Sequence, residues 1–303
     1  MYRYIDSEME VAVGSALFQL ALFVAVVSRP TYRALTAGRP DRVAAWAAAQ
    51  GLDVTAANQD ALADDLRRTG RWRAAGALVG LGIAIVVPEL EIRVYRGPRP
   101  GGNIGFLDFW AVALGYLAGV LVGEFGRRRP PGTARRVASL SPRELAEYVP
   151  PVARRWLAWG AGASVGAGVA FLLLPMHDSA TVGRAVVAVV PPVGAVAFAF
   201  AAPRLARWLL HRAQRAGTPL EIAADDALRS AGARAVVAAA VVLVLVSLAV
   251  ELFAVSLTDV EFLRWTGWMV GLVALGLAYR AWRALVEPGA WRVRRPPLQG
   301  RPA

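Results

Sequence analysis

Seven apolar stretches alternate with polar segments along the chain. The most apolar of them runs from residue 235 to 250 and follows a polar, helix-forming stretch that begins at Asp225. A helix of roughly 20 mainly apolar residues crosses the roughly 30 Å of hydrocarbon in a bilayer. The pattern therefore predicts an all-α, polytopic transmembrane bundle with spans at 11–27, 74–87, 104–123, 156–176, 185–202, 235–257 and 265–284.

The spans and the segments between them divide the chain into consecutive regions. These are an outer tail with span one (1–28), a cytosolic helical hairpin (29–73), spans two and three (74–126), a cytosolic loop with an interfacial helix (127–155), spans four and five (156–203), a cytosolic helical loop (204–234), spans six and seven (235–284) and a basic cytosolic tail (285–303).

The cytosolic hairpin contains two short helices with start and stop signals. The first is predicted over residues 41–50 and stops at Gly51. The second begins after Thr55 and stops at Gly70. Two helices with a short connector also occur in DNA-binding proteins, but no set of base-reading side chains accompanies these. We expect a hairpin that lies over the membrane face and binds no nucleic acid.

Two further helices are predicted in the other cytosolic segments. Residues 142–149 form a short helix in which Ser141 and Glu144 make a capping box. Residues 219–233 follow a similar box and lead into the sixth span. These two helices are candidate contacts for a soluble protein partner, although 142–149 also fits a simple re-entry before span four.

Small residues predict where the helices pack closely. In the third span Gly115, Gly119 and Gly123 recur every four residues, which lets a neighbouring backbone approach one helix face. The fourth span has small residues on two sides: Gly162, Gly166, Ser164 and Gly168. This pattern predicts that the fourth span is the central helix of the bundle.

Arginines are distributed unevenly between the two sides of the predicted membrane. All 34 basic residues are arginine, and 28 of them lie in the segments 29–73, 127–155, 204–234 and 280–303. Cytoplasmic loops carry such an excess of basic residues. The distribution predicts an outer amino terminus, a cytoplasmic carboxyl terminus and a multi-pass protein of the cell membrane. The net charge of +12 is then a signal of topology.

A weak internal similarity relates the two halves of the bundle. The sequence ADDLRRTGRWRAAG, from Ala63, resembles ADDALRSAGARAVV, from Ala224, and FLDFWAVALG, from Phe106, resembles FLRWTGWMVG, from Phe262. Both matches have the same order and membrane orientation. They indicate a parallel repeat of spans one to three and five to seven around span four, although apolar segments also align through composition alone.

Composition and motifs argue against most enzyme classes. Hydrophobic residues make up 56% of the chain and charged residues 18%, and there is no cysteine. The two histidines, His177 and His211, fall on opposite sides of the predicted membrane and cannot share a metal site. The chain has no nucleotide-binding loop and no HExxH motif. We expect no cofactor and no metal.

The segments ASLSPRELAEYVPP and ADDALRS, together with the bundle layout, resemble uncharacterised polytopic membrane proteins of actinobacteria. The resemblance implies a multi-pass helical protein. It implies no activity, and it assigns no site residue.

Acidic residues near the outer ends of the spans form the candidate site. At about 1.5 Å per residue, Glu251 lies roughly 24 Å along its helix from Ala235, or about 6 Å inside the outer edge of a 30 Å core. A carboxylate there is costly unless it is paired or wetted. Arg264 is the nearest candidate partner, and Glu89 with Asp108 would mirror the pair in a true repeat. The site fits a cation, a proton or a small cationic solute; a structural salt bridge is the alternative.

Pro191 and Pro192 interrupt the fifth span, and they are either a hinge beside a transport site or an ordinary kink. The function that fits the sequence best is a non-enzymatic, permease-like or transport-associated membrane component. A structural or regulatory membrane protein is the alternative, and an intramembrane enzyme a weaker one.

Overall fold

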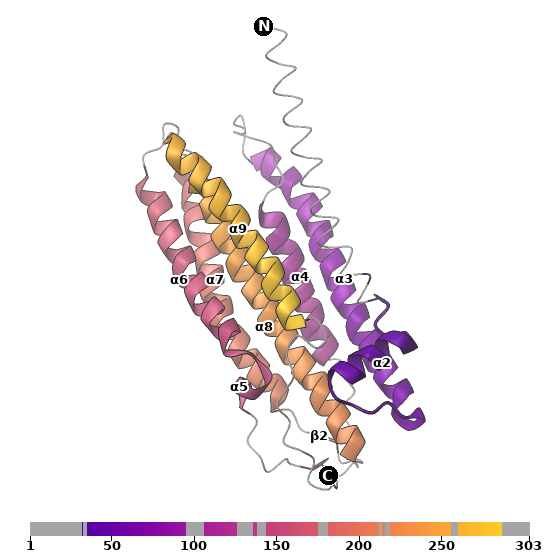
Figure 1. Cartoon of the computed structure of the whole chain (residues 1–303). Coiled ribbons are helices and arrows are strands. Elements are labelled where there is room, and N and C mark those ends of the chain that lie inside the picture. Colours follow the sequence, from indigo (N-terminus) through magenta and orange to yellow (C-terminus); the bar gives the residue numbers. More distant parts are fainter. Residues whose placement is uncertain are drawn as a thin grey trace.

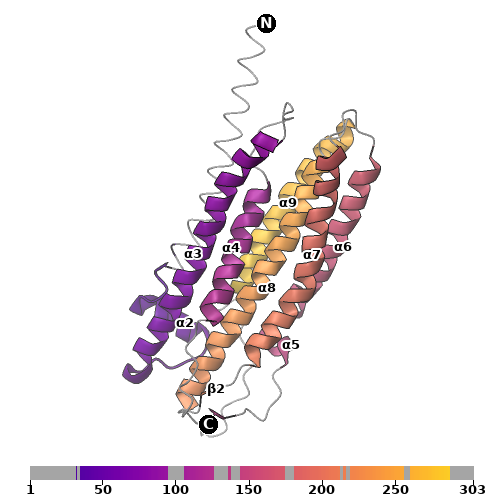
Figure 2. The same cartoon turned by 180° about the vertical axis from the view of Figure 1, so that it is seen from behind.

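Long helices that run in alternating directions make up the protein (Figures 1 and 2). The computed structural model describes residues 32, 35–94, 106–125, 136–137, 144–174, 181–211, 214–215, 219–255 and 260–286. The elements in chain order are α2 (Pro40–Ala49), α3 (Ala56–Val94), α4 (Phe106–Phe125), β1 (Arg136–Val137), α5 (Leu145–Tyr148), α6 (Pro151–Leu173), α7 (Thr181–Leu210), β2 (Gln214–Arg215), α8 (Pro219–Val255) and α9 (Glu261–Val286).

The helices form two pairs on either side of α8. The pair α3 and α4 lies on one side and the pair α6 and α7 on the other, and α9 packs against α8 (Figures 1 and 2). The short elements α2, α5 and β2 gather at one end of the bundle, which we call the α2 end. The strands β1 and β2 are two residues each and pair antiparallel. All the other described elements are helices, which confirms the predicted helical bundle.

Several helices are suited to a lipid environment. Within the described residues four are long and apolar enough to cross a membrane: Pro151–Leu173, Ala188–Leu210, Ile222–Val255 and Trp265–Val286. A shorter apolar helix, Trp110–Glu124, lies within α4. These five segments fall on predicted spans three to seven. The predicted span at 11–27 lies outside the described residues.

Helix α8 is the centre of the bundle, so the prediction that the fourth span is central is wrong. In the most apolar 18-residue stretch of α8, 83% is buried inside the protein. The corresponding share is 33% for α6, 33% for α7 and 28% for α9. Side chains added at Gly162 or Gly166 of α6 would meet no protein atom within 4 Å. A helix that is apolar all round belongs in the interior, and the Ala-Val-Leu run of α8 has that character.

The α3–α4 pair is held by contact between glycine backbones, as the glycine spacing predicts. A Cβ built on Gly76 would lie 2.9 Å from the Cα of Gly119, and one built on Gly115 would lie 2.9 Å from the Cα of Gly80. Real Cβ atoms essentially never come this close to another atom. Glycines at these four positions therefore let the two helices touch along their backbones.

The first hairpin helix agrees with its prediction, but the second does not end where expected. Helix α2 ends before Gly51, which adopts a positive φ of 65°. Helix α3 continues through Gly70 to Val94, so the second hairpin helix and the second span are one helix. An interior glycine costs a helix only about 1 kcal/mol, which the long packing interface with α4 offsets.

Two other predicted boundaries are corrected. The helix predicted at 142–149 is described only as Leu145–Tyr148, and Glu144 is extended with ψ 133°, so it does not take part in a capping box. Val149 and Pro150 are extended before α6 begins at Pro151. Residues 219–233 are the beginning of α8 and not a separate helix.

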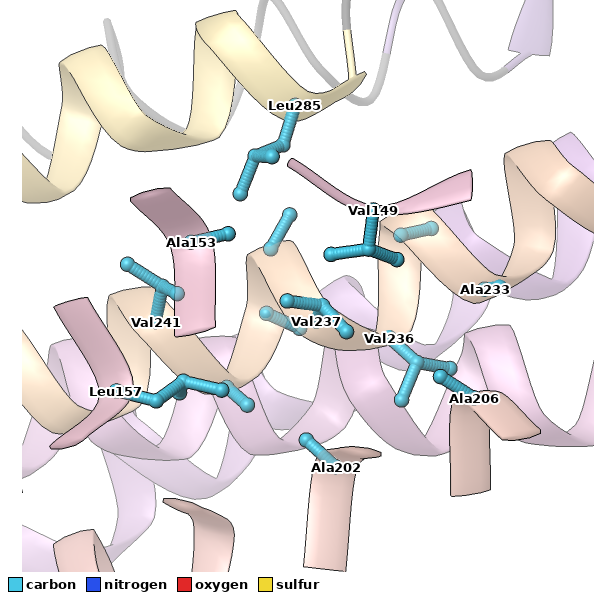
Figure 3. Packing of buried hydrophobic residues seen from close by; sticks show 14 of the residues in the cluster. Val149, Ala153, Leu157, Ala202, Ala206, Ala233, Val236, Val237, Val241 and Leu285 are labelled. Atoms are coloured by element: carbon cyan, nitrogen blue, oxygen red, sulfur yellow. The ribbon is translucent and has the colours of Figure 1, made fainter. Parts of the chain in front are cut away.

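The apolar core surrounds α8 at the α2 end of the bundle (Figure 3). Ala202 and Ala206 of α7 face Val236 and Val237 of α8, and Leu157 of α6 closes the same layer. Small side chains dominate here, which allows four helices to approach one another closely. Helix α2 lies over the first turns of α8 through an apolar cluster of Val43, Leu62, Ala224 and Leu228.

Candidate functional site

The side chain of Glu251 is the most unusual polar group of the bundle interior. It projects from α8 one turn before the helix ends at Val255, and it is fully buried. Neither of its carboxyl oxygens has a hydrogen-bond partner within the described part of the chain. A buried polar group without a partner costs about 1–3 kcal/mol, and more if it is charged. Such a group calls for a functional explanation.

Ser164 of α6 is the polar neighbour of Glu251. Its side chain is fully buried, and the hydroxyl lies near enough to the carboxyl group to interact with it. The hydroxyl nevertheless completes no hydrogen bond with any described residue. The α6–α8 junction therefore holds one carboxyl and one hydroxyl group that face each other with unused hydrogen-bonding capacity.

Small residues and a proline of α7 surround this carboxyl–hydroxyl pair. A Cβ on Gly168 would lie 3.4 Å from Glu251 Oε1, 2.6 Å from the carbonyl oxygen of Ala188 and 2.9 Å from Pro192 Cγ. Gly168 thus makes room for the carboxyl group where α6, α7 and α8 meet. Phe171, Ala188 and Ala254 form an apolar cluster in the same region.

A second polar contact lies one turn before Glu251 on α8. The indole Nε1 of Trp110 donates a hydrogen bond to Ser247 Oγ at 2.8 Å, and this hydroxyl donates to the carbonyl oxygen of Leu243. Gly194 of α7 leaves the space that the indole ring occupies. This contact is satisfied, and it ties α4 to α8 beside the candidate site.

The predicted outer site is located only in part. Glu251 is buried inside the bundle, whereas the side chains of Arg264, Glu89 and Asp108 lie outside the described part of the structure, so the predicted pairing stays a prediction. Sequence reasoning missed Ser164 as a site residue and treated it as a small packing residue. Its place four residues before Gly168 on one face of α6 was the available signal.

The predicted hinge lies next to the site. Pro191 and Pro192 are buried inside α7, and the helix is continuous from Thr181 to Leu210. Proline removes one backbone donor and clashes with the preceding turn, so it weakens the helix locally. Pro192 contacts Gly168, which borders the Glu251 carboxyl group. A bend of α7 at the prolines would therefore move atoms next to Glu251.

A separate polar cluster lies at the α2 end. Arg229 and Asp225 of α8 form an ion pair at 2.8 Å, and Arg234 donates to Gln50 Oε1 at 3.3 Å. The carboxyl group of Glu124 is almost fully buried against Gly232 and takes part in a polar interaction. These contacts join α2, α4 and α8, and we interpret them as structural.

The site offers one carboxyl group and one hydroxyl group for chemistry. No group of three or more His, Asp or Glu side chains suited to a metal ion occurs among the described residues. No protein-family model, no curated protein and no solved structure matches the chain. The proposed function therefore rests on the geometry of the site.

Proposed function

We propose that the protein is a non-enzymatic, transport-associated component of the cell membrane, and that Glu251 with Ser164 binds a proton or a small monovalent cation inside the bundle. The observation that carries this proposal is the fully buried Glu251 carboxyl group, which has no hydrogen-bond partner among the described residues. Ionisable residues inside membrane bundles are rare and usually mark ion or proton pathways.

The cost of the Glu251 environment supports exchange over a permanent structural role. A carboxylate in an apolar interior needs a counter-charge or a proton. Without a counter-charge or a proton, one buried hydroxyl group offsets little of the cost of burying the carboxylate. A site that binds and releases a small cation, or a proton, gives the carboxyl group a compensating partner for part of a cycle. A structural or regulatory membrane protein with a Glu251–Arg264 salt bridge is the competing proposal.

The proline pair of α7 fits the same proposal. Release of an occluded proton or cation requires the surroundings of Glu251 to change, and Pro192 touches the glycine that borders the carboxyl group. We propose that α7 bends at Pro191 and Pro192 during this change. Soluble partners are proposed to bind at the α2 end through residues 142–149 and 219–233.

The second part of the proposal concerns topology. We propose seven spans, built as a parallel repeat, with an outer amino terminus. The repeat is supported by the parallel directions of α3 and α8, each of which begins in a polar stretch and pairs with the next helix. The arginine distribution supports the orientation.

Single cysteines test this topology, because the native chain has no cysteine. Cysteines that replace Ser7 or Ser179 should react with an impermeant maleimide in intact cells. Cysteines that replace Thr55 or Ala146, which are exposed at the α2 end, should react only after the cells are opened. The opposite labelling pattern would invert the orientation.

A hydrophobic carbodiimide tests the site without a known substrate. Such reagents modify protonated carboxyl groups in apolar surroundings, so we expect dicyclohexylcarbodiimide to modify Glu251 in the purified protein, detected by peptide mass spectrometry. Glu251→Gln should remove this adduct. Protection by Na⁺ but not by choline at constant pH would identify a cation site, whereas equal labelling in both salts would identify a proton site.

Glu124 is the matched control for this experiment. It is buried to the same degree as Glu251 but interacts with another group, and so it should react less than Glu251. Absence of any adduct on Glu251 under conditions that modify exposed acids would favour the salt-bridge proposal instead.

A further inference from the structure

Arginines gather on the outer surface of α6 and α7 at the α2 end of the bundle. Arg154 and Arg155 lie in the first turn of α6, and Arg204 and Arg207 lie in the last two turns of α7. All four are exposed. Because the two helices pack side by side and run in opposite directions, these ends are neighbours (Figures 1 and 2).

The helix register places the four arginines at one level. Gly168 of α6 contacts Pro192 of α7. Arg155 precedes Gly168 by 13 residues and Arg204 follows Pro192 by 12. At about 1.5 Å per residue, both therefore lie roughly 20 Å from this contact. They form one basic surface, which we call the α6–α7 arginine surface (Arg154, Arg155, Arg204 and Arg207).

The charges of this surface are not neutralised by the described protein. None of the four arginines forms an ion pair with a described residue, and the sequences of α6 and α7 contain no Asp or Glu. Arg204 donates to the carbonyl oxygen of Phe200 at 2.8 Å and stacks over its ring. The guanidinium groups of Arg154, Arg155 and Arg207 remain available to an external anion.

Exposed aromatic side chains lie next to the arginines along α6 and α7, toward the apolar middle of the two helices. Trp159 is 78% exposed one turn beyond Arg155, Phe200 is 62% exposed one turn before Arg204, and Trp208 is 42% exposed beside Arg207. Tryptophan favours the headgroup level of a bilayer. The combination of aromatic rings and free guanidinium groups at one level matches the boundary between acyl chains and phosphates.

We infer that the α6–α7 arginine surface binds the headgroup of an anionic phospholipid. Arginine holds a phosphate through two parallel hydrogen bonds, and basic residues at the cytoplasmic end of membrane helices attract anionic lipids. The acyl chains would lie along the exposed apolar side chains of α6 and α7. This site is separate from Glu251, and it stands whether or not Glu251 exchanges ions.

Lipid titration of the purified full chain tests the inference. In neutral detergent we expect phosphatidylglycerol, but not phosphatidylcholine, to raise the unfolding temperature, and native mass spectrometry should detect retained phosphatidylglycerol. Replacing all four arginines by glutamine should weaken the apparent affinity by about tenfold or more. High salt should weaken the wild-type effect.

A second quadruple variant controls for net charge. Glutamine at Arg39, Arg42, Arg67 and Arg68 removes the same charge from α2 and the beginning of α3 and should leave the lipid effect unchanged. The inference is overturned if both variants lose the effect equally, if neither loses it, or if phosphatidylcholine acts as strongly as phosphatidylglycerol.

Photocrosslinking of the wild-type protein keeps the test decisive if the α6–α7 variant fails to fold. A phosphatidylglycerol analogue with a photoreactive group near its headgroup should modify peptides that contain residues 151–160 or 200–211. Crosslinks confined to other segments would overturn the inference.

Discussion

Leucine in place of Gly115 should separate α3 from α4 and prevent stable folding. The Cβ atom alone would lie 2.9 Å from the backbone nitrogen and Cα of Gly80, and it would collide with the carbonyl oxygen of Gly76. Real Cβ atoms essentially never come this close to another atom, so the two backbones would have to move apart. Overpacking in a close-packed core costs typically 1–3 kcal/mol for extra methylenes, and a backbone collision costs more. We expect little folded protein by size-exclusion chromatography in detergent.

Gly82→Leu is the matched control on the facing helix. A Cβ at Gly82 would meet no atom within 4 Å, and the residue is exposed on α3. This variant should yield wild-type amounts of folded protein with an unchanged unfolding temperature. If Gly115→Leu is tolerated as well as Gly82→Leu, the backbone contact between α3 and α4 is not the interface of the folded protein.

Methionine in place of Glu251 should make the protein more stable and remove the proposed ion exchange. The variant replaces a buried group that lacks hydrogen-bond partners among the described residues by an apolar side chain of similar size. Removal of an unsatisfied polar group should stabilise the fold by about 1–3 kcal/mol. Thermal unfolding in detergent measures the gain. The carbodiimide adduct on Glu251 should be lost in the same variant.

Glu124→Met provides the opposite expectation. Glu124 is equally buried, but its carboxyl group takes part in polar interactions at the α2 end. Removing one partner of a buried polar interaction leaves the other partner unsatisfied and costs about 1–3 kcal/mol, so this variant should unfold at a lower temperature. A loss of stability of that size in Glu251→Met would instead assign Glu251 a structural salt bridge and refute the exchange proposal.

Together these two substitutions distinguish two roles of a buried glutamate. One that stabilises the fold is expected for Glu124, and one that destabilises the fold but serves function is expected for Glu251. A group that lowers the stability of a fold persists when function requires it. Stabilisation on removal of Glu251, combined with loss of ion binding, would be the signature of a functional carboxyl group.

The sequence alone determined the class of the protein and several local features. An apolar run that is long enough to cross a bilayer is expected to be helical, because a helix satisfies its own backbone hydrogen bonds in lipid. Gly51 determined the end of α2, since a positive φ favours glycine. The spacing of Gly115 and Gly119 predicted a close backbone contact, because a helix places every fourth residue on one face.

Only the tertiary structure decided which faces of the helices meet. The glycines of α6 predicted a central helix, but Gly162 and Gly166 face outward while Ser164 and Gly168 face α7 and α8. Small residues on two sides of a helix do not reveal which side is covered. Likewise Gly70 resembled a helix end, and packing against α4 carried α3 through it. The pairing of Ser164 with Glu251 depends on the register between α6 and α8, which arises from contacts far apart in sequence and has no local signal.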